Sequence, residues 1–273
     1  MQTRALAAAA ILALAGTAAI AADLPGSVAA APPPPWPRTW DWNGFYGGIN
    51  AGYSFGNAHN TWNIPPVLVT GVDAETFNGP LGGIQAGWNW QYSAFLAGIE
   101  ADIDYGAETG KQTFNSAFSV TTSTLVTGTI SVPHSYTLTW ISTVRGRLGL
   151  AFNRALLYGT GGFAWAADKE PLSATATHAA DGSTAAFMNP QGLTAIRVGW
   201  TAGGGAELAL NNNWTVRAEY LYVDLGTKSR GFATQAAFPI SNTTLLPPGT
   251  GTISTRTTDN IARLGINYKF TPF

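Results

Sequence analysis

The three histidines are the first residues to consider for chemistry, because the chain contains no cysteine. General acid–base catalysis needs a histidine that is held by a carboxylate and that faces a nucleophile. His59, His134 and His178 fall in three separate polar loops, at spacings that match no known metal site. We therefore expect no catalytic residues, no metal site and no cofactor, with a loop-based lipid enzyme as a minor alternative.

Charged side chains show a stronger pattern, since they alternate with apolar ones. In residues 95–106, Phe95, Ile99 and Ile103 fall on one face and Glu100 and Asp102 on the other. A two-residue period of this kind predicts a β-strand with one apolar and one polar face.

The same alternation recurs in eight segments of the chain. These segments are 43–56, 79–92, 95–106, 136–152, 155–167, 195–210, 214–225 and 259–270. The faces of 155–167 stay open, because Leu156 and Tyr158 have the opposite parity to Phe163 and Trp165. A β-bulge would resolve that conflict.

The connections between the segments also alternate. Short turns fall near residues 93, 154 and 212, whereas long polar stretches fall at 57–78, 108–134, 168–193 and 227–257. Short turns on one rim and long loops on the other are typical of transmembrane barrels. In lipid every backbone polar group must be paired, so a spanning sheet has to close. We predict an all-β fold, an eight-stranded antiparallel transmembrane β-barrel with short periplasmic turns and long extracellular loops.

The composition supports a membrane location. Only 11% of the 273 residues are charged, against about 25% in an ordinary soluble domain. A soluble lipocalin-like binding barrel, with its apolar face inside, is the alternative that alternation alone leaves open. The low charge and the unequal loops favour the membrane barrel, and the net charge of −1 argues against a nucleic-acid partner.

The polar faces together define a charged lumen. An eight-stranded barrel is just wide enough inside for side chains to fill it, and buried ions of opposite sign should pair. We expect a salt-bridged, plugged interior, with a narrow porin-like channel for small solutes or ions as the alternative. The predicted lumen charges are Glu100, Asp102, Asp104, Arg145, Arg147, Arg197, Glu207, Arg217, Glu219, Arg263 and Lys269.

Large aromatic residues cluster near the strand ends, where amphipathic rings lie at the level of lipid headgroups. The predicted aromatic girdle comprises Trp88, Trp90, Tyr92, Tyr105, Tyr136, Trp200, Trp214 and Tyr222.

The N-terminus has the features of an export signal. Arg4 precedes an apolar run over 5–15 and the small-residue motif Ala19-Ile20-Ala21, which predicts a cleaved signal peptide over 1–21. A Pro-rich periplasmic linker over 22–42 and the barrel over 43–273 follow.

Three segments carry a family resemblance. The runs 42–53 (WNGFYGGINAGY), 214–224 (WTVRAEYLYVD) and 262–270 (ARLGINYKF) resemble the opacity-type, porin-family outer-membrane β-barrel proteins of alphaproteobacteria. The resemblance implies a location in the cell outer membrane of a Gram-negative bacterium and roles in envelope integrity, surface contact or limited permeability. Implied partners are outer-membrane lipid and lipopolysaccharide, the barrel-assembly machinery, and a host or cell-surface molecule that contacts the loops. Leu264, Ile266, Tyr268 and Phe270 resemble the assembly signal of a final strand.

Overall fold

The computed structural model describes residues 40–121, 125–235, 237–240, 243–246 and 248–270, and side chains of these residues outside 236–247. The expected signal peptide and most of the expected linker lie outside the described residues. Within the described residues, no helix is long and apolar enough to cross a membrane.

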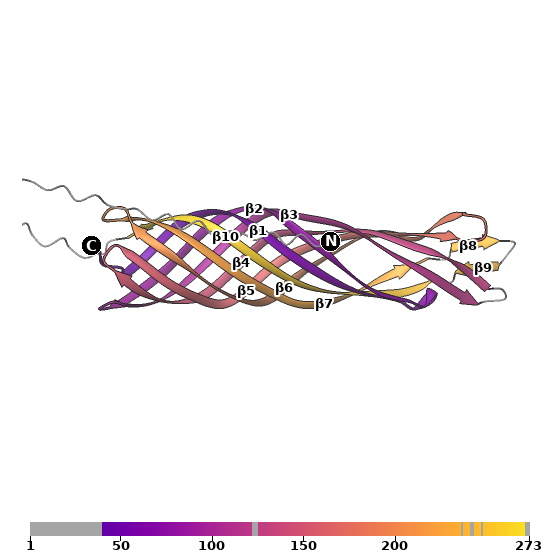
Figure 1. Ribbon diagram of the computed structural model, residues 1–273, viewed down its shortest axis with the longest axis horizontal. Coiled ribbons are helices and arrows are strands. Elements are labelled where there is room, and N and C mark those ends of the chain that lie inside the picture. The colour runs from indigo at the N-terminus through magenta and orange to yellow at the C-terminus, as the bar shows by residue number, and fades with distance from the viewer. Residues whose placement is uncertain (1–39, 122–124, 236, 241–242, 247, 271–273) are drawn as a thin grey trace, which may run out of the picture. The chain divides into compact units, whose positions relative to one another are not determined.

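Eight long strands close into one antiparallel barrel (Figure 1). In chain order they are β1 (Gly44–Ile64), β2 (Val69–Tyr92), β3 (Phe95–Thr121), β4 (Leu125–Phe152), β5 (Ala155–His178), β6 (Thr184–Ala209), β7 (Trp214–Thr234) and β10 (Gly249–Lys269). A 3-10 turn, η1 (Pro65–Val67), joins β1 to β2, and the short strands β8 (Ala237–Ile240) and β9 (Thr243–Leu246) pair with each other. The prediction of eight antiparallel strands in a ring is confirmed.

The strands are staggered around the ring. A path of directly paired residues that starts at Tyr46 on β1 crosses all the other long strands and returns to β1 at Gly56. Such a stagger requires tilted strands, as Figure 1 shows. Side chains that face inward from different strands therefore interlock at several levels of the lumen.

The strands are much longer than the bilayer needs. A spanning strand takes about 9–11 residues, whereas β3 has 27 and β4 has 28. Most of each long polar stretch that the sequence indicated as a loop is strand, because the in–out alternation continues there with small polar residues on the outer face. The barrel wall therefore extends well beyond the membrane on the side away from the short turns.

The outer face that meets lipid is apolar. Ile49, Ile84, Ile99 and Leu148 are between 61% and 71% exposed, on four different strands. These large side chains point away from the lumen, so the polarity expected for a membrane barrel, with apolar residues outside, holds.

Irregular registers decide which residues face inward. On β4 a register shift between Leu138 and Trp140 inverts the alternation, so that Tyr136 and Leu138 lie buried in the lumen. On β5 no shift is needed between Leu156 and Phe163: Leu156 is buried inside the barrel, while Phe163 is 65% exposed outside. The apolar residues of that segment have opposite parities because some face the lumen and others face lipid, on one regular strand.

Candidate functional site: the charged barrel interior

A network of arginines and carboxylates fills the lumen at the level of the membrane. Glu100 on β3 and Arg145 on β4 are directly paired across the sheet, and Nη2 of Arg145 lies 2.5 Å from Oε1 of Glu100. The same Glu100 accepts from Nη1 of Arg147 at 3.2 Å and from Nη1 of Arg217 at 2.5 Å. The Tyr46 hydroxyl donates to Glu100 at 2.6 Å. One carboxylate on β3 thus joins β4 and β7, the two strands that carry these three arginines, to β1.

Arg263 on β10 organises the other side of this network. Its Nη1 lies 2.5 Å from Asp104, and its Nη2 lies 2.8 Å from Asp102 and 2.7 Å from Glu219. Glu219 also accepts from Arg145 Nη1 at 3.1 Å. Because each arginine presents a planar fork of donors, one guanidinium can bridge two or three carboxylates in this way.

The network compensates a large cost of burial. Its arginines are at most 3% exposed and its carboxylates at most 5%, and a buried ion without a partner costs several kcal/mol. The charges are Glu100, Asp102, Asp104, Glu207 and Glu219 with Arg145, Arg147, Arg217 and Arg263. Five carboxylates and four guanidiniums nearly cancel, so this network is close to neutral.

Two predicted lumen charges lie apart from this network. Arg197 is buried on β6 at a higher level, where its Nε lies 2.8 Å from Asp168. Lys269 lies at the end of β10, at the mouth beside the short turns, where its ammonium lies 3.6 Å from a carboxylate oxygen of Asp41 and 5.5 Å from the Trp40 ring. Lys269 has the inward parity of β10, but it is the last residue of the strand. Its side chain therefore lies at the mouth of the barrel and contacts Asp41 and Trp40 instead of the network.

Apolar layers lie above and below the charges. Along β5 the inward residues are first Leu156 and Tyr158, then Ala164 and Ala166, and each pair belongs to a different buried cluster. The lowest cluster contains Trp40, Trp42, Leu96, Leu156, Tyr158 and Ala209. A third cluster closes the far end of the barrel with Trp62, Phe114, Phe118, Phe187 and Phe232 among its members. Water therefore meets packed apolar side chains at several successive levels.

A second group of charges lies between the middle and far apolar layers. Asp168 on β5 pairs with Arg197 and also with Arg230 on β7, and Arg230 Nη1 lies 2.7 Å from Glu170. Asp168, Glu170 and Arg230 were not among the predicted lumen charges, because the strands expected from the sequence end before these residues. The signal was present, since Ala166, Asp168, Glu170 and Leu172 continue the inward parity of β5.

The third charged group surrounds His134 and lies in the wall beyond the membrane. His134 Nε2 is 3.2 Å from Asp73 and 3.7 Å from Glu75. Burial lowers the pKa of His134, but the hydrogen bond to Asp73 and the charges of both carboxylates outweigh it and leave the pKa raised. Burial raises the pKa of Glu75 to about 7, against the opposing charge of His134.

The predicted girdle residues form two groups on the outer face. Trp88, Trp90 and Trp214 are 45–68% exposed near the short turns, together with Tyr92. Tyr105 and Trp200 lie at the other edge of the apolar band, where the rings of Trp200 and Tyr222 are 5.5 Å apart. Assigning Tyr136 to the girdle was wrong, because the register shift on β4 places it in the lumen, 4.8 Å from the ring of Phe77.

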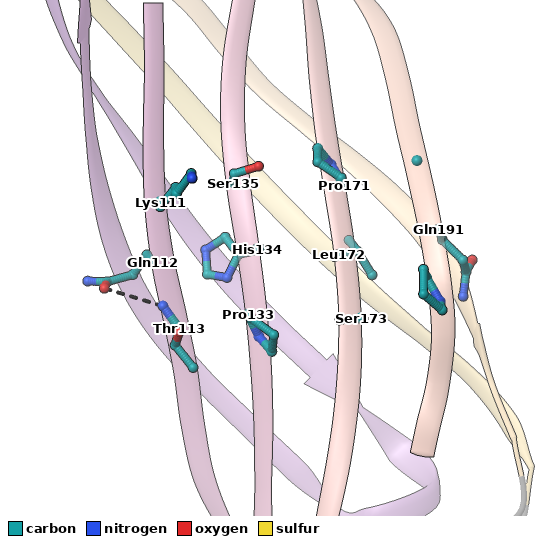
Figure 2. Close-up of a pocket in the computed structure, with 12 residues that line it drawn as sticks. Lys111, Gln112, Thr113, Pro133, His134, Ser135, Pro171, Leu172, Ser173 and Gln191 are labelled. Atoms are coloured by element: carbon teal, nitrogen blue, oxygen red, sulfur yellow. Dashed lines mark hydrogen bonds between the residues drawn. The ribbon is translucent and has the colours of Figure 1, made fainter.

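A hollow of about 640 Å³ is present in the wall beyond the membrane (Figure 2). Three consecutive residues from each of β3, β4, β5 and β6 line it, and three of them are the prolines Pro133, Pro171 and Pro190. Proline has no N–H for the ladder. Near these prolines the β4–β5 ladder lacks some of its pairs, and the β5–β6 register shifts between Leu172 and Thr175. Lys111 is the exposed charge at this hollow, and His134, Ser135 and Ser173 are also among its lining residues. The ring nitrogens of His134 contact Asn60, the Val132 carbonyl and the carboxylates of Asp73 and Glu75.

The histidines are not brought together. His59 is exposed on the outer face of β1, His134 is buried, and His178 at the end of β5 is 3.1 Å from Asp181. All three lie in strands, not in loops. The described residues contain no group of three histidines or carboxylates that is arranged to hold a metal ion.

Comparisons with known proteins agree with this architecture. The chain is 33% identical over 278 residues to the 31 kDa outer-membrane immunogenic protein of Brucella melitensis, covering 96% of this chain and 98% of the relative. It is 28% identical to the 22 kDa outer membrane protein of Rhizobium leguminosarum, covering 84% of this chain and 78% of the relative. The solved structure of OprG from Pseudomonas aeruginosa aligns with a TM-score of 0.46 at 11% identity, over 86% of this chain and 99% of that one.

A family model also identifies the chain as an outer-membrane barrel. Residues 6–270 match the model described as the outer membrane protein beta-barrel domain. Since this match includes all eight long strands, and since the relatives named above are outer-membrane proteins, the location is the outer membrane. The chain belongs to the family of proteins with an outer membrane protein beta-barrel domain.

Proposed function

We propose that this protein is a non-catalytic, closed barrel that strengthens the outer membrane and presents an extended wall to the outside of the cell. The observation that carries the proposal is the filled lumen, in which Arg145, Arg147, Arg217 and Arg263 are at most 3% exposed and are held by carboxylates. Such a barrel contributes mechanical continuity to the envelope but no wide path for solutes.

The long wall supports the surface role. On β4 the residues from Leu125 to Thr139 lie beyond the apolar band, and their outward residues are mostly small and polar. The relatives from Brucella are named immunogenic, and in this chain the same extended wall is the part that antibodies or a host-cell molecule would reach.

Further partners follow from the outer face. Lipid and lipopolysaccharide would contact the apolar band and the cations just beyond it, such as exposed Lys111 and Lys169. Leu264, Ile266, Tyr268 and Phe270 are 36–64% exposed along the outer face of the last strand. In that position they would be accessible to the barrel-assembly machinery before insertion.

Planar bilayer recording of refolded protein tests the closed lumen. We expect no stable conductance step at moderate voltage, because an ion would have to cross both the arginine network and the apolar layers. A reproducible open state in the unmodified protein would contradict the proposal and favour the narrow channel. A deletion strain should become sensitive to detergent, and the unmodified gene should restore resistance.

A further inference from the structure

The ladder between β6 and β7 is incomplete. Its pairs run from Ala209 with Thr215 up to Trp200 with Asp224. Both strands continue past that point, β6 paired only with β5 and β7 paired only with β10 in the described registers. The two strands meet again farther along, where the Gln235 N–H donates to the Phe187 carbonyl at 2.8 Å. The wall therefore contains an opening in its backbone hydrogen bonding just beyond the membrane.

Solvent reaches inward-facing positions at this opening. Lys228 on β7 is paired with Thr255 on β10, so the two side chains share the inner face. Thr255 is 1% exposed, whereas Lys228 is exposed. Leu193 on the facing edge of β6 is also partly exposed although it packs against the far apolar cluster.

Basic groups with unused hydrogen-bonding atoms lie behind the opening. Arg197 and Arg230 share one carboxylate oxygen of Asp168, and Arg197 Nη1 donates to the Thr255 carbonyl at 2.9 Å. Within the described residues, four buried atoms of this group have no hydrogen-bond partner. Three of them can donate, namely Nη2 of Arg197, Nε of Arg230 and Oγ1 of Thr255, and the fourth is the acceptor Oδ1 of Asp168. Arg197 is 2% exposed, so its unpartnered donor is deeply buried.

The group has an excess of positive charge. Arg197 and Arg230 are balanced by Asp168 and Glu170. The exposed Lys228, next to Thr255 in the β7–β10 register, adds one positive charge when all five groups are ionised. A buried donor of a charged group that lacks an acceptor is costly, and hydrogen bonds between guanidinium and an oxyanion are among the stronger ones in proteins. An anion with several oxygen atoms would satisfy the guanidinium donors and the threonine hydroxyl together.

We propose that the opening between β6 and β7 leads to a phosphate-binding site formed by Arg197, Arg230, Lys228 and Thr255. The phosphate is either inorganic phosphate or the phosphate monoester of a lipid headgroup in the outer leaflet. The second source would be close at hand, because the Trp200–Tyr222 pair at the edge of the apolar band lies at the lower end of the opening. The proposal is independent of whether the lumen conducts.

Titration of refolded protein in a phosphate-free detergent tests the site. Inorganic phosphate is added in one series and phosphatidic acid, carried in micelles of the same detergent, in another, and binding is followed by phosphorus NMR. Saturable binding in either series supports the site and identifies its source. The absence of saturable binding in both series would overturn the proposal and indicate that solvent alone occupies the opening.

Matched variants separate a specific site from general attraction to positive charge. Lys228→Gln should weaken binding at least about tenfold, the loss expected for one charge-assisted hydrogen bond. Lys111→Gln removes the same charge from the outer face of β3, and it should change binding less than about twofold, as expected for a screened surface charge. Equal weakening by the two variants would refute the site. Lys228 is exposed, so its variant should fold, and heat-modifiable migration on gels verifies that both variants form barrels.

Discussion

Glu100 and Arg145 face each other on neighbouring strands and are joined by a contact of 2.5 Å inside the barrel. Glu100 also holds Arg147 and Arg217, so three guanidiniums converge on this carboxylate. Removing it would take one partner from each of three buried guanidiniums and leave Arg217 with only the longer 3.7 Å contact to Glu219 among the ion pairs of the described residues.

We predict that Glu100→Ala lowers the free energy of unfolding by about 3–5 kcal/mol, the range for breaking a buried ion pair on one side. Urea unfolding in lipid vesicles measures the change. Thr113→Ala, an exposed position on the same strand, is the control and should leave stability within about 0.5 kcal/mol. Equal stability of Glu100→Ala and the parent would show that the carboxylate does not hold the network together.

The apolar layers predict that a cavity made in one layer lowers the stability of the barrel without opening a conducting path. Phe77 is fully buried in the middle apolar cluster, so Phe77→Ala should cost about 3–5 kcal/mol of stability. The far cluster around Trp62 stays packed, so no conductance should appear. Thr76→Ala, on the outer face beside it, should be close to neutral. A conducting Phe77→Ala barrel would mean that the far cluster does not seal the lumen.

Because of the outer apolar band, the loss of stability caused by a charged side chain on the outer face should depend strongly on its position. Ile84 is 61% exposed on the lipid-facing side of β2, and Ile84→Arg should destabilise the inserted barrel by about 2–4 kcal/mol if it lies near the bilayer centre. Ser119→Arg on the polar wall of β3 should have little effect. Folding titrations in vesicles compare the two. Similar costs at both positions would place the membrane elsewhere on the barrel.

The His134 cluster predicts that stability falls as pH rises. The folded-state pKa of His134 is above 6.5, and that of Glu75 is raised from 4.5 to about 7. Both groups therefore bind a proton more tightly in the folded state than in the unfolded one. Glu75 contributes a decrease in the free energy of unfolding from pH 4.5 to about 7. His134 contributes a further decrease above pH 6.5.

Unfolding measured between pH 5 and 8 in the parent and in the double variant His134→Gln, Glu75→Gln tests this linkage. The difference between the parent and the double variant should shrink or reverse in sign as pH rises, because the titrating groups are absent from the variant. His59→Gln, on the outer face of β1, is the control and should follow the parent. Parallel profiles for parent and double variant would exclude a role of the cluster in the pH dependence.

From the sequence alone, two-residue alternation predicted most of the architecture. Strands such as 95–106 place carboxylates on one face and large apolar residues on the other, and a closed barrel is the one spanning sheet that pairs every backbone group. The low charge content then assigned the apolar face to lipid. The inward residues Glu100, Arg145 and Arg263 followed directly, because parity within a regular strand needs no knowledge of the neighbours.

Tertiary structure decided what parity within one strand cannot show. The shift between Leu138 and Trp140 depends on how β4 pairs with β5, so only the assembled sheet placed Tyr136 inside. Polar stretches form strands because neighbouring strands supply backbone hydrogen-bond partners for them. A local composition rich in threonine and serine does not reveal this pairing. Arg197 and Arg230 meet on Asp168 through contacts among β5, β6 and β7, beside the stretch where β6 and β7 are not paired with each other. Pairing between strands is a long-range property, so it was set by the fold and not by any segment alone.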